Sequence, residues 1–255
     1  MQHDQIALQL WTVRHEAARD LEGTLGAVAA AGYGAVELAG LHDVVAERLA
    51  TILRDSRLQP VASHEGIERL RDDLDGVAVR LGTIGCDRVV VPWLPDEDRR
   101  TVDDVRAVAG ELGTFAERLA IQGLRLGFHN HDVEFAAIDG STVWDTLIDA
   151  LPPNVEIELD VYWASVGGRD PVTEIERLGD RVRLLHMKDR AHGPNGEAPR
   201  DAPPGEGTLP FERIVEVART AGVEWYVVEQ DEPLDPIRDI ATGYRNLAVL
   251  ARQSA

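Results

Sequence analysis

Short apolar runs alternate with longer segments of helical periodicity along the whole chain. The runs cover residues 6–11, 34–38, 58–64, 87–93, 124–130, 155–160, 182–188 and 225–230. Apolar runs of this length, bounded by turn residues, are typical of strands that are buried on both faces. The pattern therefore predicts eight buried strands.

Between the runs, apolar residues recur at i, i+3, i+4 and i+7, which is the spacing of an amphipathic helix. These segments cover residues 24–32, 44–56, 77–85, 102–123 and 210–222. Several of them close on glycine, at Gly32, Gly85, Gly123 and Gly222. Glycine ends a helix at low cost because it adopts the left-handed conformation easily. Strands that alternate with helices predict an α/β fold with a parallel sheet.

Eight such units, with no gap long enough for a second domain, predict a (β/α)8 TIM barrel in which residues 1–255 form one domain. A doubly wound sheet is the alternative. Such a sheet typically has a glycine-rich phosphate loop after its first strand, where this chain has TVRHEAARD. The connection 189–208 is polar and rich in proline and glycine. We expect it to be mobile or to form a lid over the site.

Composition narrows the possible partners. The chain has 45 acidic and 26 basic residues, a formal net charge of −19, which argues against a nucleic-acid backbone or an anionic membrane as partner. A small neutral or cation-assisted substrate fits better. Barrels of this kind often form dimers, so a homodimer is possible.

Cysteine usage and the start of the chain bear on the compartment. Cys86 is the only cysteine, so an intramolecular disulfide and a thiolate zinc cluster are excluded, and we expect a buried structural thiol. The chain starts without the features of a signal peptide, and no apolar stretch reaches the ~18 residues of a membrane span. The expected location is the cytoplasm.

In a barrel of this type the functional groups come from the carboxyl ends of the strands and the loops that follow. The candidates at those positions are Trp11, Glu37, His64, Trp93, His129, His131, Glu134, Asp160, Trp163, His186, Lys188, Glu229 and Asp231. Carboxylates combined with one or two imidazoles suit one divalent cation, Mn²⁺ first, with Mg²⁺, Co²⁺ or Zn²⁺ as alternatives.

Asp160 is the first predicted ligand. It ends the run 155–160, and strand alternation places Glu158 on the same face and Glu156 below it. A carboxylate at the end of an apolar strand is costly unless it is paired or metal-bound. A helix N-cap is the alternative role.

His186 and Glu229 are the second and third predicted metal ligands. His186 and Lys188 share one face of their run, so both should point into one pocket. A lone histidine on an apolar strand is more often a core residue, but this one lies in line with Asp160 and Glu229. Glu229 follows the apolar sequence WYVV, where an unpaired carboxylate would be costly. Asp231 is expected to be a cap or a partner of a ligand.

The fifth run leaves the fourth ligand open. Alternation puts His129 and His131 on one face of FHNHDVEF and Glu134 on the other. If the strand ends near residue 130, Glu134 can turn back over the barrel mouth and complete the set. If the strand continues, His129 is the inward group. We favour Glu134, with His129 and His131 as contacts to substrate.

Several motifs together carry a resemblance. HNHDVEF, ELDVYWASVGGRDPV, LLHMKDR, GEGTLPFERIV and VVEQDEP, with the opening IALQLWTVR, resemble the sugar phosphate isomerase/epimerase superfamily of xylose isomerase-like TIM barrels. That superfamily includes inosose dehydratase and the ketose 3-epimerases. The resemblance implies a divalent metal held by Glu, Asp, His and Glu from strands five to eight, with both glutamates as acid and base. Asp160, His186 and Glu229 match those positions directly.

The fifth strand departs from that pattern. The epimerases have a Glu-Asn-His triplet where this chain has His129, Asn130 and His131. The departure moves the chain towards the inosose-dehydratase-like members, and the resemblance does not imply a phosphorylated substrate.

The expected reaction is isomerisation or epimerisation of a small sugar or keto-sugar through a metal-stabilised enediolate. Glu134 or Glu229 would move the proton, and Lys188 would act as electrophile or acid toward the oxyanion. The remaining strand-end side chains are expected to contact the substrate: Trp11, Glu37, His64, Trp93, His129, His131 and Trp163.

Three further hypotheses remain. The first is a lyase of the same fold that dehydrates an inosose or eliminates from a 3-keto-glycoside. The second is a hydrolase related to the DNA-repair barrels, which the charge of −19 opposes because such an enzyme needs a basic groove. The third is a non-catalytic sugar-binding protein.

Overall fold

Eight parallel strands close into a barrel in this computed structural model, which describes residues 1–192 and 199–253. The strands around the barrel follow the order β1, β12, β9, β8, β5, β4, β3, β2. Their bounds are β1 Ile6–Gln9, β2 Ala35–Ala39, β3 Gln59–His64, β4 Arg88–Val91, β5 Arg125–His129, β8 Val155–Asp160, β9 Val182–Met187 and β12 Trp225–Val228. Each of the eight predicted runs forms one of these strands, so the predicted TIM barrel is confirmed.

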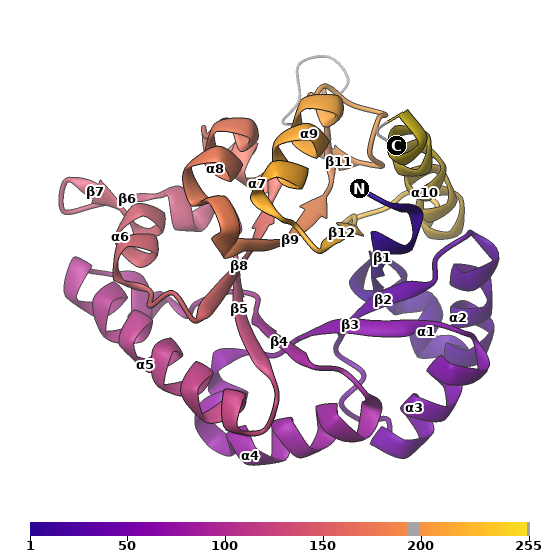
Figure 1. Cartoon of the computed structure of the whole chain (residues 1–255), viewed down its shortest axis with the longest axis horizontal. Helices are drawn as coiled ribbons and strands as arrows, with labels where there is room; N and C mark the ends of the chain where they lie inside the picture. Colours follow the sequence, from indigo (N-terminus) through magenta and orange to yellow (C-terminus); the bar gives the residue numbers. More distant parts are fainter. Residues whose placement is uncertain (193–198, 254–255) are drawn as a thin grey trace.

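Helices surround the strands (Figure 1). The longer ones are α2 Leu21–Ala30, α3 Ala46–Asp55, α4 Ile67–Ile84, α5 Val102–Ile121, α9 Phe211–Ala221 and α10 Pro236–Gln253. The shorter ones are α1 Arg14–Arg19, α6 Val143–Ala150, α7 Val161–Val166 and α8 Pro171–Leu178. No helix in the described ranges has the length and apolar content needed to cross a bilayer.

Local sequence explains where several helices begin and end. α5 begins with a capping box, in which Thr101 and Asp104 each accept a hydrogen bond from the other's backbone N–H. α4 and α9 end at Gly85 and Gly222, whose φ values of 86° and 83° lie in the left-handed region that glycine adopts without strain. The glycine ends predicted for these two helices are therefore confirmed.

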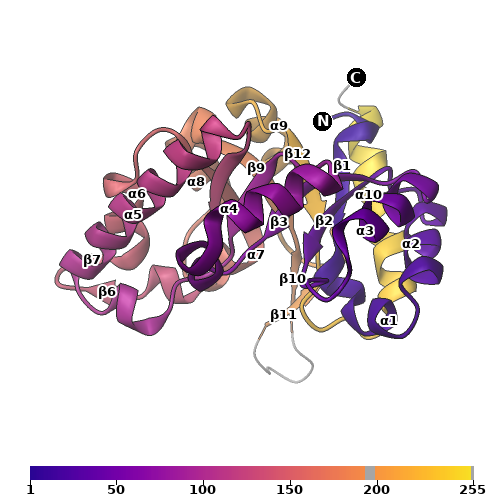
Figure 2. The same cartoon turned by 90° about the horizontal axis from the view of Figure 1, so that it is seen from below.

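The segment 189–208 is only partly loop. Strands β10 Asp189–Ala191 and β11 Arg200–Ala202 pair antiparallel, while residues 193–198 lie outside the described residues. Figure 2 shows this ribbon on the opposite side of the molecule from the two termini. Asp189 anchors the start of this two-stranded ribbon. The Asp189 carboxylate accepts hydrogen bonds from the backbone N–H groups of Gly205, Gly207 and Leu209 at 2.8–3.0 Å.

The apolar core has two parts. The larger part lies between the strands and the helices, and the smaller part fills the barrel with the small or branched side chains Ala7, Ala35, Val61, Ala62, Val90, Leu184 and Val227. Small residues at these positions leave room inside the barrel for the polar layers above and below them.

A buried guanidinium closes the amino-terminal end of the barrel. Arg88 on β4 is fully buried, and its Nε donates to Glu156 of β8 at 2.7 Å. Its other nitrogens contact Glu224 before β12 and the Val61 carbonyl of β3. Burial alone would raise the pKa of Glu224, but its hydrogen bonds with Arg88 and Arg125 lower that pKa below the ordinary value. One side chain thus joins three other segments of the barrel.

We expect Arg88→Met to destabilise the fold strongly, because it leaves Glu156 and Glu224 without their buried partner. The expected loss in the free energy of unfolding is about 3 kcal/mol, measured by urea denaturation. Arg183→Met is the matched control, since Arg183 also pairs with Glu224 but is about a third exposed. Its expected cost is below about 1 kcal/mol. Equal losses for both variants would contradict this role of Arg88.

Cys86 is buried, as predicted, and its Sγ donates to the Arg88 carbonyl oxygen. Burial raises the pKa of the thiol to about 12. Because thiolate is the reactive form, the folded protein should resist iodoacetamide at pH 8 and react only once unfolded. Mass spectrometry of the alkylated protein with and without urea checks this, and rapid modification of the native chain would show that the thiol is accessible.

Candidate active site

Three of the predicted ligands meet at the carboxyl end of the barrel. Asp160 is the last residue of β8, His186 lies in β9, and Glu229 directly follows β12. Asp160 and His186 are partners in the parallel register, which places their side chains on adjacent strands at one level. The three side chains are buried, and one ligand atom from each lies within 4.8 Å of the others. We call them the upper set.

Asp160 is the helix N-cap considered for it from the sequence, and its second carboxylate oxygen faces the predicted ion site. Its Oδ1 accepts a hydrogen bond from the Trp163 backbone N–H at 2.9 Å and so caps α7. Its Oδ2 faces the site, 3.0 Å from the Lys188 Nζ. Burial raises the pKa of Asp160 to about 6, against the opposing effect of Lys188.

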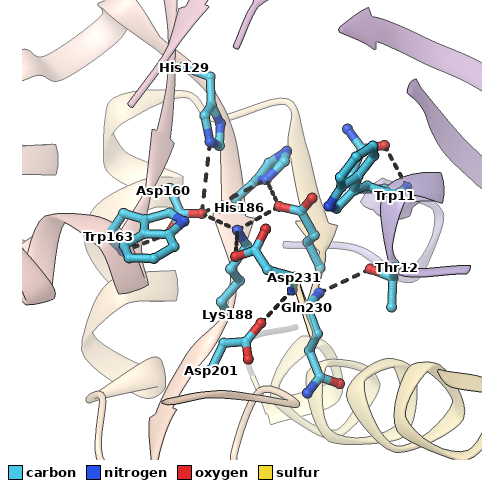
Figure 3. A network of polar contacts seen from close by, with 12 residues as sticks. Trp11, Thr12, His129, Asp160, Trp163, His186, Lys188, Asp201, Gln230 and Asp231 are labelled. Atoms are coloured by element: carbon cyan, nitrogen blue, oxygen red, sulfur yellow. Dashed lines mark hydrogen bonds and ion pairs between the residues drawn. The ribbon is translucent and has the colours of Figure 1, made fainter. Parts of the chain in front are cut away.

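Lys188 is fully buried among carboxylates (Figure 3). Its Nζ lies 3.0 Å from Asp160, 2.8 Å from Glu229 and 2.8 Å from Asp231, to which it donates a hydrogen bond. Burial alone would lower the pKa of Lys188, but these carboxylates raise it well above its usual value. The ammonium is therefore a fixed positive charge at the mouth of the barrel, and Asp231 is a partner of Lys188.

The upper set fits a divalent cation in its donor atoms. Two carboxylates and one imidazole within a few ångströms form a mixed oxygen and nitrogen set that Mn²⁺, Co²⁺ or Zn²⁺ accepts. The Asp160 Oδ2 is buried and accepts no hydrogen bond within the described ranges, so its lone pairs are available to an ion. Lys188 contacts two of the same carboxylates, so a bound ion would compete with the ammonium for them.

A second group of side chains adjoins the upper set, with its carboxylate one layer lower on β8. His64 ends β3, His129 ends β5 and Glu158 lies two residues before Asp160 on β8. The Glu158 Oε2 lies 2.7 Å from His64 Nε2, 3.0 Å from His129 Nδ1 and 3.2 Å from His186 Nε2. We call His64, His129, Glu158 and His186 the lower set; one ligand atom from each lies within 4.8 Å of the others.

Glu37 of β2 borders the lower set. Its Oε2 lies 2.6 Å from His186 Nε2 and accepts a hydrogen bond from Gln9 Nε2 at 2.9 Å. Gln9 and Glu37 are register partners on β1 and β2, which explains their contact. Burial and the neighbouring Glu158 carboxylate raise the pKa of Glu37 to about 7.

A pocket of about 360 Å³ opens above these groups. Trp11 and Trp93 form part of its wall and are 43% and 45% exposed, so large apolar surface faces the pocket space. The residues that line it include His64, His129, His131, Glu229 and Asp231. The volume suits a small ligand. Five of the seven residues predicted to contact substrate therefore line one pocket.

Trp163 and Glu37 are not among the residues that line it. Trp163 lies beside the pocket, with its ring 5.7 Å from that of His131 and 5.7 Å from the Lys188 Nζ. Glu37 is buried in the layer beneath. Trp163 can therefore act on the site through His131 and Lys188, and Glu37 can act through His186.

The structure does not bring Glu134 into either set. β5 ends at His129, and the chain then forms the 3-10 turn η4 Val133–Phe135. The Glu134 Oε2 accepts a hydrogen bond from the His131 backbone N–H at 2.7 Å, and burial raises the pKa of the carboxyl to about 7. From the fifth strand, His129 lies nearer the upper set, with its Nε2 4.0 Å from the Asp160 Oδ2.

Sequence reasoning passed over two polar contributors. Glu158 shares the inward face of β8 with Asp160, and it pairs in register with His129. Strand alternation gave the signal for Glu158, but its partners lie on β3, β5 and β9 and become visible only in the closed barrel. Gln9 carries no charge and had no sequence signal beyond its place on β1.

Comparison with known proteins gives the family. The family model described as xylose isomerase-like TIM barrel matches residues 25–248. The chain belongs to this family. A crystal structure of a sugar phosphate isomerase/epimerase from Parabacteroides distasonis superposes with a TM-score of 0.83 at 22% identity, covering 98% of this chain and 95% of that one.

Two further members of similar fold or sequence are informative. The IOLI protein, solved with a bound zinc atom, superposes with a TM-score of 0.75 at 16% identity and covers 98% of both chains. An inosose dehydratase from Lacticaseibacillus casei is 24% identical in a 158-residue alignment, which covers 56% of this chain and 52% of the relative. The chain thus spans about half the length of the curated relatives it matches.

Competition between Lys188 and a bound ion can be measured. We expect Lys188→Met to bind Mn²⁺ about tenfold more tightly or better, because it frees two carboxylates. Asp231→Asn should have the opposite effect, since Lys188 then keeps only Asp160 and Glu229 as partners. Isothermal titration with Mn²⁺ at one pH gives both dissociation constants. Equal or weaker binding by the Lys188 variant would mean that no competition exists.

Proposed function

We propose that this xylose isomerase-like barrel isomerises or epimerises a small polyhydroxylated ketone, with one divalent cation held by Asp160, His186 and Glu229. The observation that carries the proposal is the convergence of these donors and the Lys188 ammonium beneath a pocket with two tryptophans in its wall. The family supports the same chemistry, because its named relatives include isomerases, epimerases and an inosose dehydratase.

Different side chains would carry out different steps of the proposed reaction. A bound cation would polarise the substrate carbonyl. The C–H of the neighbouring hydroxyl-bearing carbon would thereby become more acidic. Glu229 lines the pocket and is ionised, since Lys188 and His186 lower its pKa well below the usual value despite burial. It would accept the proton from carbon. Lys188 would stabilise the negative charge that develops on the substrate oxygen.

Return of the proton determines the product. Delivery to the opposite face of the same carbon epimerises the substrate, whereas delivery to the neighbouring carbon isomerises it. His131 lines the pocket, and burial together with Lys188 lowers its pKa to about 4, so its ring is neutral at neutral pH. We assign His131 as the second proton-transfer group, held in place by the hydrogen bond from its backbone to Glu134.

Dehydration is the second candidate, and one distance favours it. The Lys188 Nζ lies 2.8 Å from the Glu229 Oε2, so a proton acceptor lies next to an ammonium that would hydrogen-bond to a departing hydroxide. That arrangement suits loss of a proton and a hydroxyl group from one face of a substrate. The sequence match to inosose dehydratase points in the same direction.

The two reactions are separated by NMR in D₂O. We expect the protein with Mn²⁺ to introduce solvent deuterium at one carbon of tagatose or fructose without loss of water. Formation of an unsaturated product from 2-keto-myo-inositol would instead establish the lyase. Turnover of neither substrate class with any of Mn²⁺, Mg²⁺, Co²⁺ or Zn²⁺ would refute the proposal.

Glu229→Gln tests the assigned base. It should lower kcat by about 10²–10⁴-fold, as expected for loss of a general base. Glu232→Gln is the matched control: its side chain is 86% exposed and pairs with Arg14, so activity should be unchanged. Retention of activity in the Glu229 variant would exclude that residue as the base.

A further inference from the structure

The lower set has the composition of a metal site in its own right. It offers three imidazoles and one carboxylate, whereas the upper set offers two carboxylates and one imidazole. Glu158 lies two residues below Asp160 on β8, a rise of about 6–7 Å along the strand, so the two sets occupy successive layers of the barrel. We propose that His64, His129, His186 and Glu158 bind a second type of divalent ion, one that prefers nitrogen ligands, such as Zn²⁺.

The distances agree with four-coordinate binding. Ligands about 2.0–2.1 Å from a tetrahedral ion lie about 3.3 Å from one another. The Glu158 Oε2 is already 2.7, 3.0 and 3.2 Å from the three imidazole nitrogens. Small side-chain movements would therefore open a tetrahedral cage, with no change in the strands that carry the ligands.

Charge and unmet hydrogen-bonding capacity point to a cation here. Glu158 and Glu37 are fully buried, and their Oε1 atoms have no hydrogen-bond partner in the described part of the chain. Across residues 1–192 and 199–253, neither carboxylate forms an ion pair with a lysine or arginine; their partners are histidines. The upper set differs because two of its carboxylates already pair with the Lys188 ammonium. A divalent ion would supply positive charge that the lower set now receives only from its imidazoles.

His186 connects the two sets through its two ring nitrogens. Its Nδ1 lies 2.7 Å from Glu229 of the upper set, and its Nε2 faces Glu158 and Glu37. An ion in each set at once would take both nitrogens and remove the last ring proton. The sets should therefore compete, with Mn²⁺ or Mg²⁺ in the oxygen-rich upper set and Zn²⁺ in the nitrogen-rich lower set.

The lower set is open to an ion from the substrate pocket. His64 and His129 both line that pocket, and the His64 side chain is 12% exposed. An ion that enters between Trp11 and Trp93 would meet these imidazoles at the pocket floor. Glu37, held by Gln9, has its Oε2 2.6 Å from the His186 Nε2 and could add a fifth oxygen to the ion.

The ¹⁵N spectrum of the histidine rings tests the assignment atom by atom. One equivalent of Zn²⁺ is added to the wild-type chain in the absence of substrate. We expect His64 Nε2, His129 Nδ1 and His186 Nε2 to shift to values typical of metal-bound nitrogen. Shifts confined to His186 Nδ1 would place the ion in the upper set and overturn the proposal. The absence of any ring shift would identify the lower set as a proton-sharing network and overturn it equally.

Variants separate the sets by affinity. His64→Asn removes a ligand of the lower set alone and should weaken Zn²⁺ binding on the order of 100-fold or more, with Mn²⁺ affinity unchanged. Asp160→Asn should do the reverse. His131→Gln is the matched control, since this imidazole lines the same pocket but belongs to neither set. Thermal unfolding of each variant without metal shows whether it is folded.

This inference does not rest on the proposed reaction. The ring spectra and the Zn²⁺ affinities are measured without substrate, so a negative result there leaves the deuterium-exchange experiment to decide the reaction. Failure of the exchange experiment likewise leaves the Zn²⁺ result intact.

Discussion

Buried negative charge is the constraint on which the carboxyl end of the barrel depends. Asp160, Glu229, Glu158 and Glu37 are all buried, and each must find compensation inside the barrel or take up a proton. The Lys188 ammonium compensates the charges of Asp160 and Glu229. Histidine side chains pair with Glu158 and Glu37. The resulting polar layers rest on a floor of alanine, valine and leucine, and Arg88 with its glutamates closes the far end.

This arrangement separates stability from chemistry along the barrel axis. The guanidinium layer at the amino-terminal end makes its contacts with its own glutamates and a backbone carbonyl, far from the residues that line the pocket. The opposite end carries the groups that line the pocket or lie directly beneath it. Enzymes of this fold use that same division, with catalytic groups at the carboxyl ends of the strands.

The sequence allowed the strands and their inward residues to be predicted because period-two alternation and apolar runs are local signals. Asp160, His186 and Glu229 were found in this way. Glu134 was favoured as the fourth ligand over His129, but that choice depends on where β5 stops, and η4 turns Glu134 onto the backbone of His131. The short helices α6, α7 and α8 were also missed, since six to eight residues are too few to show a period. The role of Glu158 depends on contacts between non-adjacent strands, which no local pattern records.

Asp160 is both a helix cap and a charged group of the site. One oxygen faces Lys188, and the other holds the first turn of α7, the helix that carries Trp163. The carboxylate that pairs with Lys188 therefore also fixes the start of the helix whose Trp163 ring lies 5.7 Å from that of His131. Any substitution of Asp160 removes a helix cap together with a partner of the buried ammonium.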